Sequence, residues 1–231
     1  MGLPEMSLAD RYAEVQRRIS EAARSAGREA EDITLIAVSK RQPEALLVEL
    51  AALGHRDFGE NMIQAWRSRL DVNGLEAVRW HLIGGVQTNK AKFIARTPPA
   101  CLHTIDRVGL IDALETRLAP ASSLDVLLQV NVDREPQKSG CFPEDLDALV
   151  DAAASAPTLR VRGLMAIPRP TESGPPLSAF EAMGDLLAKV SDRVEGPPVL
   201  SMGMSSDFEA AIAMGSTAVR VGTALFGTRE S

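Results

Sequence analysis

The stretch ITLIAVSKRQPEALLVELAALG, residues 33–54, decides the fold class because it holds one complete strand-to-helix unit. ITLIAVS (33–39) is rich in apolar and β-branched residues, which is typical of a strand buried on both faces. Pro43 stands where a helix begins and Gly54 where it ends, the usual asymmetry of helix termini. Lys40 lies between the two elements, at the carboxyl end of the predicted strand.

The same unit recurs along the whole chain of 231 residues. We predict eight strands, at 33–39, 56–60, 78–84, 101–106, 125–131, 160–167, 198–204 and 218–226. Between them lie helix patterns, at 43–53, 107–118, 143–156, 177–194 and 207–214. This alternation predicts a parallel sheet covered by helices. Eight repeats favour a closed (β/α)₈ barrel of the TIM type over an open doubly wound sheet. We expect residues 1–231 to form a single barrel domain.

One further helix is predicted before the first strand, at LADRYAEVQRRISEAARSA (8–26). Its apolar residues share one face: Leu8, Tyr12, Val15, Ile19 and Ala22. Only GTRES (227–231) follows the eighth predicted strand, which is too short for a closing helix. We therefore expect the N-terminal helix to cover the seam where the last barrel helix would lie.

Composition and charge argue against a membrane or a nucleic acid as the binding partner. Charged residues make up 24% and hydrophobic residues 45% of the chain, as in ordinary soluble globular proteins. No apolar run is long enough to span a bilayer, and the first residues lack a signal-peptide pattern. The net charge of −6 argues against sequence-independent binding to nucleic acid. We expect a cytoplasmic protein with neither a membrane nor a nucleic acid as partner.

The cysteines and histidines show no metal-ligand spacing. Cys101 and Cys141 lie far apart, which favours a reduced protein and leaves a single disulfide open. His55, His81 and His103 are scattered in the sequence without a recognisable metal motif. We predict no metal site.

Polar residues follow several of the predicted strands, at the end where barrels of this type carry their active sites. Lys40 follows the first strand, and Glu60 and Asn61 follow the second. The seventh leads into SMGMSSD (201–207), and the eighth carries Arg220, Gly222 and Thr223. The last two segments predict an anion-binding site, because free backbone N–H groups at a helix start and the hydroxyl groups of Ser201, Ser205 and Thr223 all donate hydrogen bonds. Gly203 and Gly222 would let the backbone approach a ligand.

Two of these residues admit a structural and a chemical interpretation. Arg220 alternates with Val219 and Val221, so it shares one strand face with Ala218 and Gly222. It is either a structural ion pair or a buried guanidinium that serves a ligand. Lys40 is either a solvated loop residue or an amine that forms a Schiff base with a carbonyl compound.

Seven segments together resemble the pyridoxal phosphate (PLP) homeostasis proteins, which are single barrels similar to the N-terminal barrel of alanine racemase. They cover nearly the whole chain: IAVSK (36–40), FGEN (58–61), WHLIGGVQTNK (80–90), VNVDREPQKSG (130–140), GLMAIP (163–168), SMGMSSDFEAAIAMGST (201–217) and VRVGTALFG (219–227). The resemblance implies that Lys40 holds PLP as a Schiff base and that Arg220 faces the pyridine nitrogen. It also implies that Asn61 lies beside the ring and that the phosphate is bound by Ser201, Ser205, Gly222 and Thr223.

The resemblance implies a carrier that stores, buffers or delivers PLP inside the cell, with no catalytic residue of its own. Its expected partners are PLP and PLP-dependent apoenzymes, and the expected state is a monomer or a weak dimer. An arginine on the pyridine nitrogen disfavours the ring proton on which strong PLP carbanion chemistry depends.

Two enzymatic alternatives and one additional site remain open. A PLP-dependent amino-acid racemase needs a second base, and the single tyrosine, Tyr12, falls in the N-terminal helix. A Schiff-base lysine aldolase needs an acid–base partner near Lys40, for which Glu60 is the candidate. Lys138, together with Lys90 and Arg134, would form a second and weaker PLP-binding patch.

Overall fold

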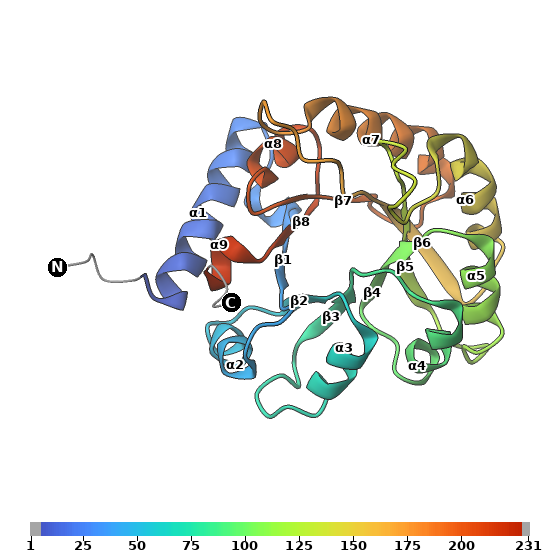
Figure 1. Ribbon diagram of the computed structural model, residues 1–231, viewed down its shortest axis with the longest axis horizontal. Helices are drawn as coiled ribbons and strands as arrows, with labels where there is room; N and C mark the ends of the chain where they lie inside the picture. Colours follow the sequence, from blue (N-terminus) through green and yellow to red (C-terminus); the bar gives the residue numbers. More distant parts are fainter. Residues whose placement is uncertain (1–5, 228–231) are drawn as a thin grey trace.

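The eight predicted strands form a closed parallel barrel in the computed structural model, which describes residues 6–227 (Figure 1). Strands that follow one another in sequence are paired, and β1 pairs with β8 to close the ring. The strands are β1 (Thr34–Val38), β2 (Asp57–Glu60), β3 (Arg79–Leu82), β4 (Cys101–Ile105), β5 (Leu124–Gln129), β6 (Leu159–Met165), β7 (Val199–Met204) and β8 (Ala218–Val221). The prediction of a (β/α)₈ barrel is confirmed.

Helices surround the barrel on its outer side, as Figure 1 shows. They are α1 (Leu8–Ser25), α2 (Glu44–Ala52), α3 (Ile63–Arg69), α4 (Ala91–Arg96), α5 (Val108–Glu115), α6 (Leu146–Ala154), α7 (Leu177–Val190), α8 (Phe208–Ala213) and α9 (Thr223–Phe226). Short 3₁₀ turns add η1 (Ala30–Asp32), η2 (Thr88–Lys90), η3 (Pro143–Asp145) and η4 (Ser191–Arg193). Helices α3 and α4 lie in the linkers after β2 and β3, for which the sequence patterns predicted no helix.

The prediction of an eighth strand over 218–226 is wrong in its second half. The strand ends at Val221, and α9 begins directly after Gly222. The amide groups of Leu225 and Phe226 donate to the Gly222 carbonyl at 3.0 and 2.9 Å, which closes a helical turn. A short apolar run is compatible with a buried helix as well as with a strand, and here tertiary contacts select the helix.

Helix α1 covers the seam of the barrel, as predicted. A reciprocal capping box between Ser7 and Asp10 fixes its first turn. Its buried residues are Leu8, Val15, Ile19 and Ala23, while the predicted Tyr12 and Ala22 are partly buried against the core. Arg11 Nε donates to the Leu225 carbonyl of α9 at 2.7 Å. The N-terminal helix thus substitutes for a full-length eighth barrel helix.

The helices and the two cysteines bear on the expectations about membranes and disulfides. Within residues 6–227, the helices lack the combination of length and apolar composition that crossing a membrane requires. Cys101 and Cys141 are both free, and Cys101 is buried. The disulfide that the sequence left open does not form between these two residues.

Candidate functional site

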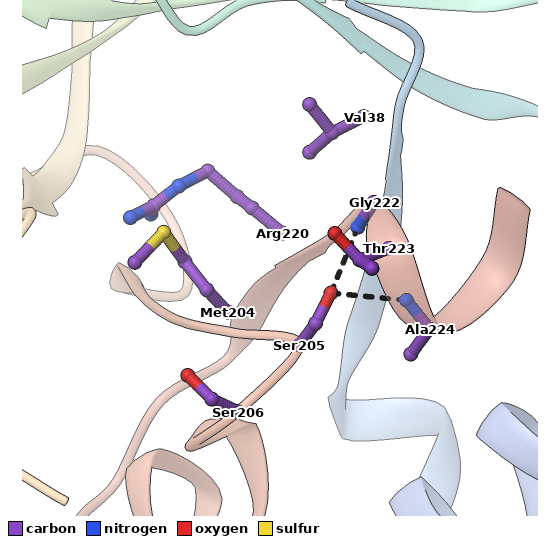
Figure 2. A pocket seen from close by; sticks show the side chains of 8 residues that line it. All are labelled: Val38, Met204, Ser205, Ser206, Arg220, Gly222, Thr223 and Ala224. Carbon is purple, nitrogen blue, oxygen red and sulfur yellow. Dashed lines mark hydrogen bonds between the residues drawn. The ribbon is translucent and has the colours of Figure 1, made fainter. Parts of the chain in front are cut away.

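A cavity of about 610 Å³ opens at the carboxyl ends of β1, β7 and β8 (Figure 2). Its volume lies within the range of roughly 300–1,000 Å³ that is usual for small-molecule sites. Four of the predicted site residues line it: Ser205, Arg220, Gly222 and Thr223. The structure adds four residues that the sequence did not single out, namely Val38, Met204, Ser206 and Ala224.

Two backbone amides converge on one side-chain oxygen in this cavity. Gly222 N–H and Ala224 N–H donate to Ser205 Oγ at 3.2 and 3.3 Å, shown as dashed lines in Figure 2. The Thr223 side chain is exposed beside them. Converging N–H and O–H donors are the groups that hold a phosphate, so this arrangement fits an anionic group.

Gly203 has a different role from the one predicted. Its φ of +90° lies in the left-handed region that favours glycine. A Cβ added there would lie 2.6 Å from the Ala211 Cβ and 3.0 Å from the Phe208 Cα. Gly203 therefore lets α8 pack closely on β7, and it does not make room for a ligand.

Arg220 is a buried guanidinium, 4% exposed, whose direct acceptors are neutral. Its Nη1 donates to Ser201 Oγ at 2.7 Å, and its Nη2 donates to the Ala166 carbonyl at 2.8 Å. No carboxylate of residues 6–227 forms a salt bridge with it. Burial lowers the pKa of Arg220 to about 10, which leaves it charged at neutral pH. Its charge is therefore available to a ligand in the cavity.

Ser201 does not line the cavity. It is completely buried on β7, and its hydroxyl accepts from Arg220 and contacts His103 Nδ1 at 3.1 Å. The structure therefore separates Ser201 from the other hydroxyl groups of the predicted phosphate site. Ser201 is linked to the cavity indirectly, through its hydrogen bond with Arg220.

Lys40 lies two residues beyond Val38, in the turn Ser39–Gln42. The turn is closed by Gln42 N–H donating to the Ser39 carbonyl at 3.0 Å. Arg41 adopts a φ of +59°, a left-handed conformation that costs about 1 kcal/mol or more for a residue other than glycine. The Lys40 side chain is half-buried and is not among the residues lining the 610 Å³ cavity.

A buried ion pair between Arg69 and Glu60 anchors the turn Ser39–Gln42. Glu60 and Arg69 are 1% and 7% exposed in their side chains, and Arg69 Nη1 lies 2.7 Å from Glu60 Oε2. The same Nη1 donates to the Ser39 carbonyl at 2.9 Å, and Nη2 donates to the Gln42 carbonyl at 3.1 Å. Ser39 Oγ adds a bond to Glu60 Oε2 at 2.9 Å. Both ends of the Lys40 turn are thus fastened to one salt bridge.

Asn61 lines a second cavity of about 230 Å³, together with Lys138 and residues after β3 and β5. Its backbone N–H donates to Glu60 Oε1 at 2.9 Å. Its side-chain Oδ1 is buried and has no hydrogen-bond partner among residues 6–227. A buried acceptor without a partner is costly, and a ligand that donates a hydrogen bond would remove this cost.

Gly84 allows the backbone of Asn61 to pass close to the end of β3. A Cβ at Gly84 would lie 2.0 Å from the Asn61 carbonyl oxygen. We expect Gly84→Ala to displace Asn61 and to lower the free energy of unfolding by about 3 kcal/mol or more, measured by urea denaturation. Gly109→Ala is the control, because Gly109 is exposed in α5 and its added Cβ meets nothing within 4 Å. It should raise stability by about 0.5–1 kcal/mol, and equal effects of the two changes would contradict the prediction.

The cations predicted to form a second PLP patch are largely engaged elsewhere. Lys138 Nζ lies 2.9 Å from Glu135 Oε2 and 3.2 Å from the Ile167 carbonyl. Arg134 pairs with Glu144. Lys90 Nζ lies 5.7 Å from the centre of the Phe93 ring. Lys138 lines the cavity that contains Asn61.

Two of the three histidines, His81 and His103, are far apart in the sequence but adjacent in space. His81 Nδ1 and His103 Nε2 lie 2.9 Å apart, and possible ligand atoms of both lie within 4.8 Å of Cys101 Sγ. The ring nitrogens are already engaged in hydrogen bonds, and burial raises the pKa of the Cys101 thiol. A protonated thiol is a poor ligand, so the cluster fits a hydrogen-bond network better than a metal site.

Comparison with known proteins gives consistent matches over the full fold. The profile of the family described as alanine racemase, N-terminal domain, matches residues 12–230. The chain is 46% identical to a protein of Pseudomonas aeruginosa and 43% identical to one of Escherichia coli, both named pyridoxal phosphate homeostasis protein. These matches cover 97% and 96% of this chain, and 96% and 97% of the relatives. The structure of PipY from Synechococcus elongatus with PLP bound is 30% identical, with a TM-score of 0.81 over 96% of this chain and 100% of PipY.

Proposed function

This chain belongs to the alanine racemase N-terminal domain family, within its pyridoxal phosphate homeostasis proteins, and on this premise we propose that it stores, buffers or delivers PLP. PLP combines a phosphate, a pyridine nitrogen and an aldehyde. In our proposal Ser205, Gly222 and Thr223 hold the phosphate, and Arg220 faces the pyridine nitrogen. The Lys40 amine condenses with the aldehyde, so that a C=N bond forms and water leaves.

The arrangement around Ser205 carries the proposal. Two backbone amides share its hydroxyl oxygen, and a buried guanidinium lines the same cavity. The donors and the positive charge match a phosphorylated, nitrogen-containing ring. Lys40 belongs to the same end of the barrel, and its turn is fastened by Glu60 and Arg69. A lysine so restrained loses less entropy on reaction than a free loop lysine would.

Several contacts support a carrier over a catalyst. The ring nitrogen would meet an arginine, which does not stabilise a protonated pyridine. Tyr12 lies on α1, and its hydroxyl is 3.4 Å from His55 Nδ1, before the amino-terminal end of β2. The racemase alternative therefore lacks its tyrosine base at the barrel mouth. The carboxylate that the aldolase alternative requires, Glu60, is paired with Arg69.

Reduction with borohydride tests the proposal directly. We expect wild-type protein mixed with PLP to show visible absorbance that borohydride abolishes. Peptide mapping by mass spectrometry should then place one phosphopyridoxyl group on Lys40. Adducts distributed evenly over the five lysines, Lys40, Lys90, Lys92, Lys138 and Lys189, would refute a specific site. A stoichiometric adduct on Lys138 would instead establish a second PLP site beside Asn61.

A parallel assay separates carrier from enzyme. The PLP-loaded protein is incubated with each chiral proteinogenic amino acid, and chiral chromatography measures the enantiomers over time. We expect no turnover above that of free PLP. Sustained racemisation that disappears with Lys40→Ala would favour the racemase alternative.

A further inference from the structure

The guanidinium of Arg220 is buried and forms no salt bridge with a carboxylate of residues 6–227, although an unpaired buried charge is unfavourable. The charge of Asp207 stabilises it only from beyond salt-bridge distance. The two neutral acceptors of Arg220, Ser201 Oγ and the Ala166 carbonyl, compensate only part of this cost. The Ser201 hydroxyl also contacts a second group, His103 Nδ1, at 3.1 Å. The interactions of Arg220 therefore continue beyond its immediate neighbours.

A continuous chain of hydrogen bonds leads from Arg220 through the barrel interior. After Ser201 and His103, it passes from His103 Nε2 to His81 Nδ1 at 2.9 Å. It ends where His81 Nε2 meets Asp57 Oδ1 at 3.0 Å. Asp57 is the first residue of β2, so the chain runs from the cavity to the amino-terminal end of the barrel.

When both imidazoles are neutral, the chemistry of the two ends fixes the direction of every bond in the chain. A guanidinium only donates and a carboxylate only accepts. With both imidazoles neutral, the hydroxyl of Ser201 must donate to His103 Nδ1, and His103 Nε2–H to His81 Nδ1. His81 Nε2–H then donates to Asp57. Burial, followed by the proximity of His81 and Arg220, holds the pKa of His103 well below its usual value, so this ring is neutral.

The carboxylate at the far end is itself stabilised as an anion. Burial raises the pKa of Asp57, but hydrogen bonds from His81 and Arg79 outweigh burial and hold it well below its usual range. Arg79 Nε donates to Asp57 Oδ1 at 2.8 Å. The chain therefore joins a cation at the cavity to an anion at the opposite end, through one hydroxyl group and two imidazole rings. Aligned hydrogen bonds of this kind polarise one another.

We propose that Ser201, His103, His81 and Asp57 form a hydrogen-bond relay that orients Arg220 toward the pyridine nitrogen of the bound ligand. Ser201 is then a positioning residue and not a phosphate contact. This inference rests on the proposed function for the identity of the ligand. The relay itself belongs to the protein alone, so its existence is testable without PLP.

Nitrogen-15 NMR of the imidazole rings tests the relay in the ligand-free protein. The chain has three histidines, and single replacements assign their signals. We expect both His81 and His103 in the Nε2–H tautomer, with slowly exchanging ring protons. Ser201→Ala should shift the Nδ1 signal of His103 and leave His55 unchanged, because the His55 ring contacts Tyr12 and the Asp57 carbonyl instead. An unshifted His103 signal, or an Nδ1–H tautomer of either ring, overturns the relay.

The consequence for the ligand is measured with PLP itself. We expect Ser201→Ala to weaken PLP retention about tenfold, as for the loss of one hydrogen bond to a charged group, and to shift the visible absorbance maximum. Ser201→Thr keeps the hydroxyl and should restore both properties to within about twofold of wild type. Near-ultraviolet circular dichroism of both variants verifies that the barrel is folded. Identical PLP spectra and retention for the folded alanine variant and wild type would reject the orienting role.

Zinc titration distinguishes the relay from a metal site at the same cluster. One equivalent of Zn²⁺ should leave the His81 and His103 ring signals unchanged if their nitrogens are committed to each other. A stoichiometric shift of both rings together with the Cys101 β-carbon would overturn the relay. Failure of the wild type to bind PLP would instead refute the proposed function, while the ring tautomers would still report on the relay.

Discussion

Lys40→Ala is expected to abolish covalently trapped PLP and the visible absorbance of the loaded protein. The amine of Lys40 is the nucleophile of the proposed Schiff base, so its removal leaves only the phosphate and ring contacts. Stability should change little, because Lys40 is a half-buried turn residue outside the core. The measurement is the absorbance spectrum, followed by borohydride reduction and intact mass spectrometry.

Lys138→Ala is the matched control for this loss. Lys138 lines the cavity that contains Asn61, and its Nζ contacts Glu135 and the Ile167 carbonyl. We expect the Lys138 variant to retain the wild-type spectrum and a single adduct. If Lys40→Ala stays coloured while Lys138→Ala becomes colourless, the two lysines have exchanged roles and the assignment is wrong.

Arg69→Ala is expected to destabilise the protein by about 3–5 kcal/mol, because it leaves the Glu60 carboxylate buried without its partner. It also removes the bonds that hold the carbonyls of Ser39 and Gln42, so the Lys40 turn should loosen. Urea unfolding followed by tryptophan fluorescence measures the first effect. The rate of PLP adduct formation measures the second.

Two control variants test whether the destabilisation by Arg69→Ala comes from the unpaired Glu60 carboxylate. Arg17→Ala removes an exposed arginine that pairs with Glu14 and Glu21 on α1, and the urea midpoint should not change. Replacing Glu60 by Leu together with Arg69 by Met removes both charges, and much of the lost stability should return. If Arg69→Ala unfolds at the wild-type urea concentration, the buried pair does not stabilise the barrel.

Most of the strands were predictable because they are local apolar runs, which indicate a buried strand without reference to tertiary contacts. Strand β2 is the exception, since DFGE contains a single apolar side chain. The eighth was overextended because residues 222–226 remain apolar after the strand ends. The turn into α9 depends on the hydroxyl of Ser205, from a different strand-to-helix unit. A bond of this kind leaves no local pattern in the sequence.

Part of the cavity lining was predictable from the positions of residues relative to the strand ends. Ser205, Gly222 and Thr223 follow strand ends, and the barrel topology alone brings such positions together. Ser201 lies within β7 and not after its end, and its hydroxyl accepts from Arg220 inside the barrel. The contacts of His81 with His103 and of Glu60 with Arg69 required the folded structure, because side-chain pairing between strands and helices has no fixed spacing in sequence.

The pairing of β1 with β8 has a consequence for how the protein is made. Thr34 pairs with Ala218, so nearly the whole chain must leave the ribosome before the ring closes. Contacts between such distant residues form late, because a long loop must close before they contribute. Lys40 follows β1, whereas Ser205, Gly222 and Thr223 follow β7 and β8 on the other side of this seam. PLP binding should therefore appear only after synthesis of the last strand, and PLP added to stalled nascent chains that end before residue 218 should leave them unlabelled by borohydride.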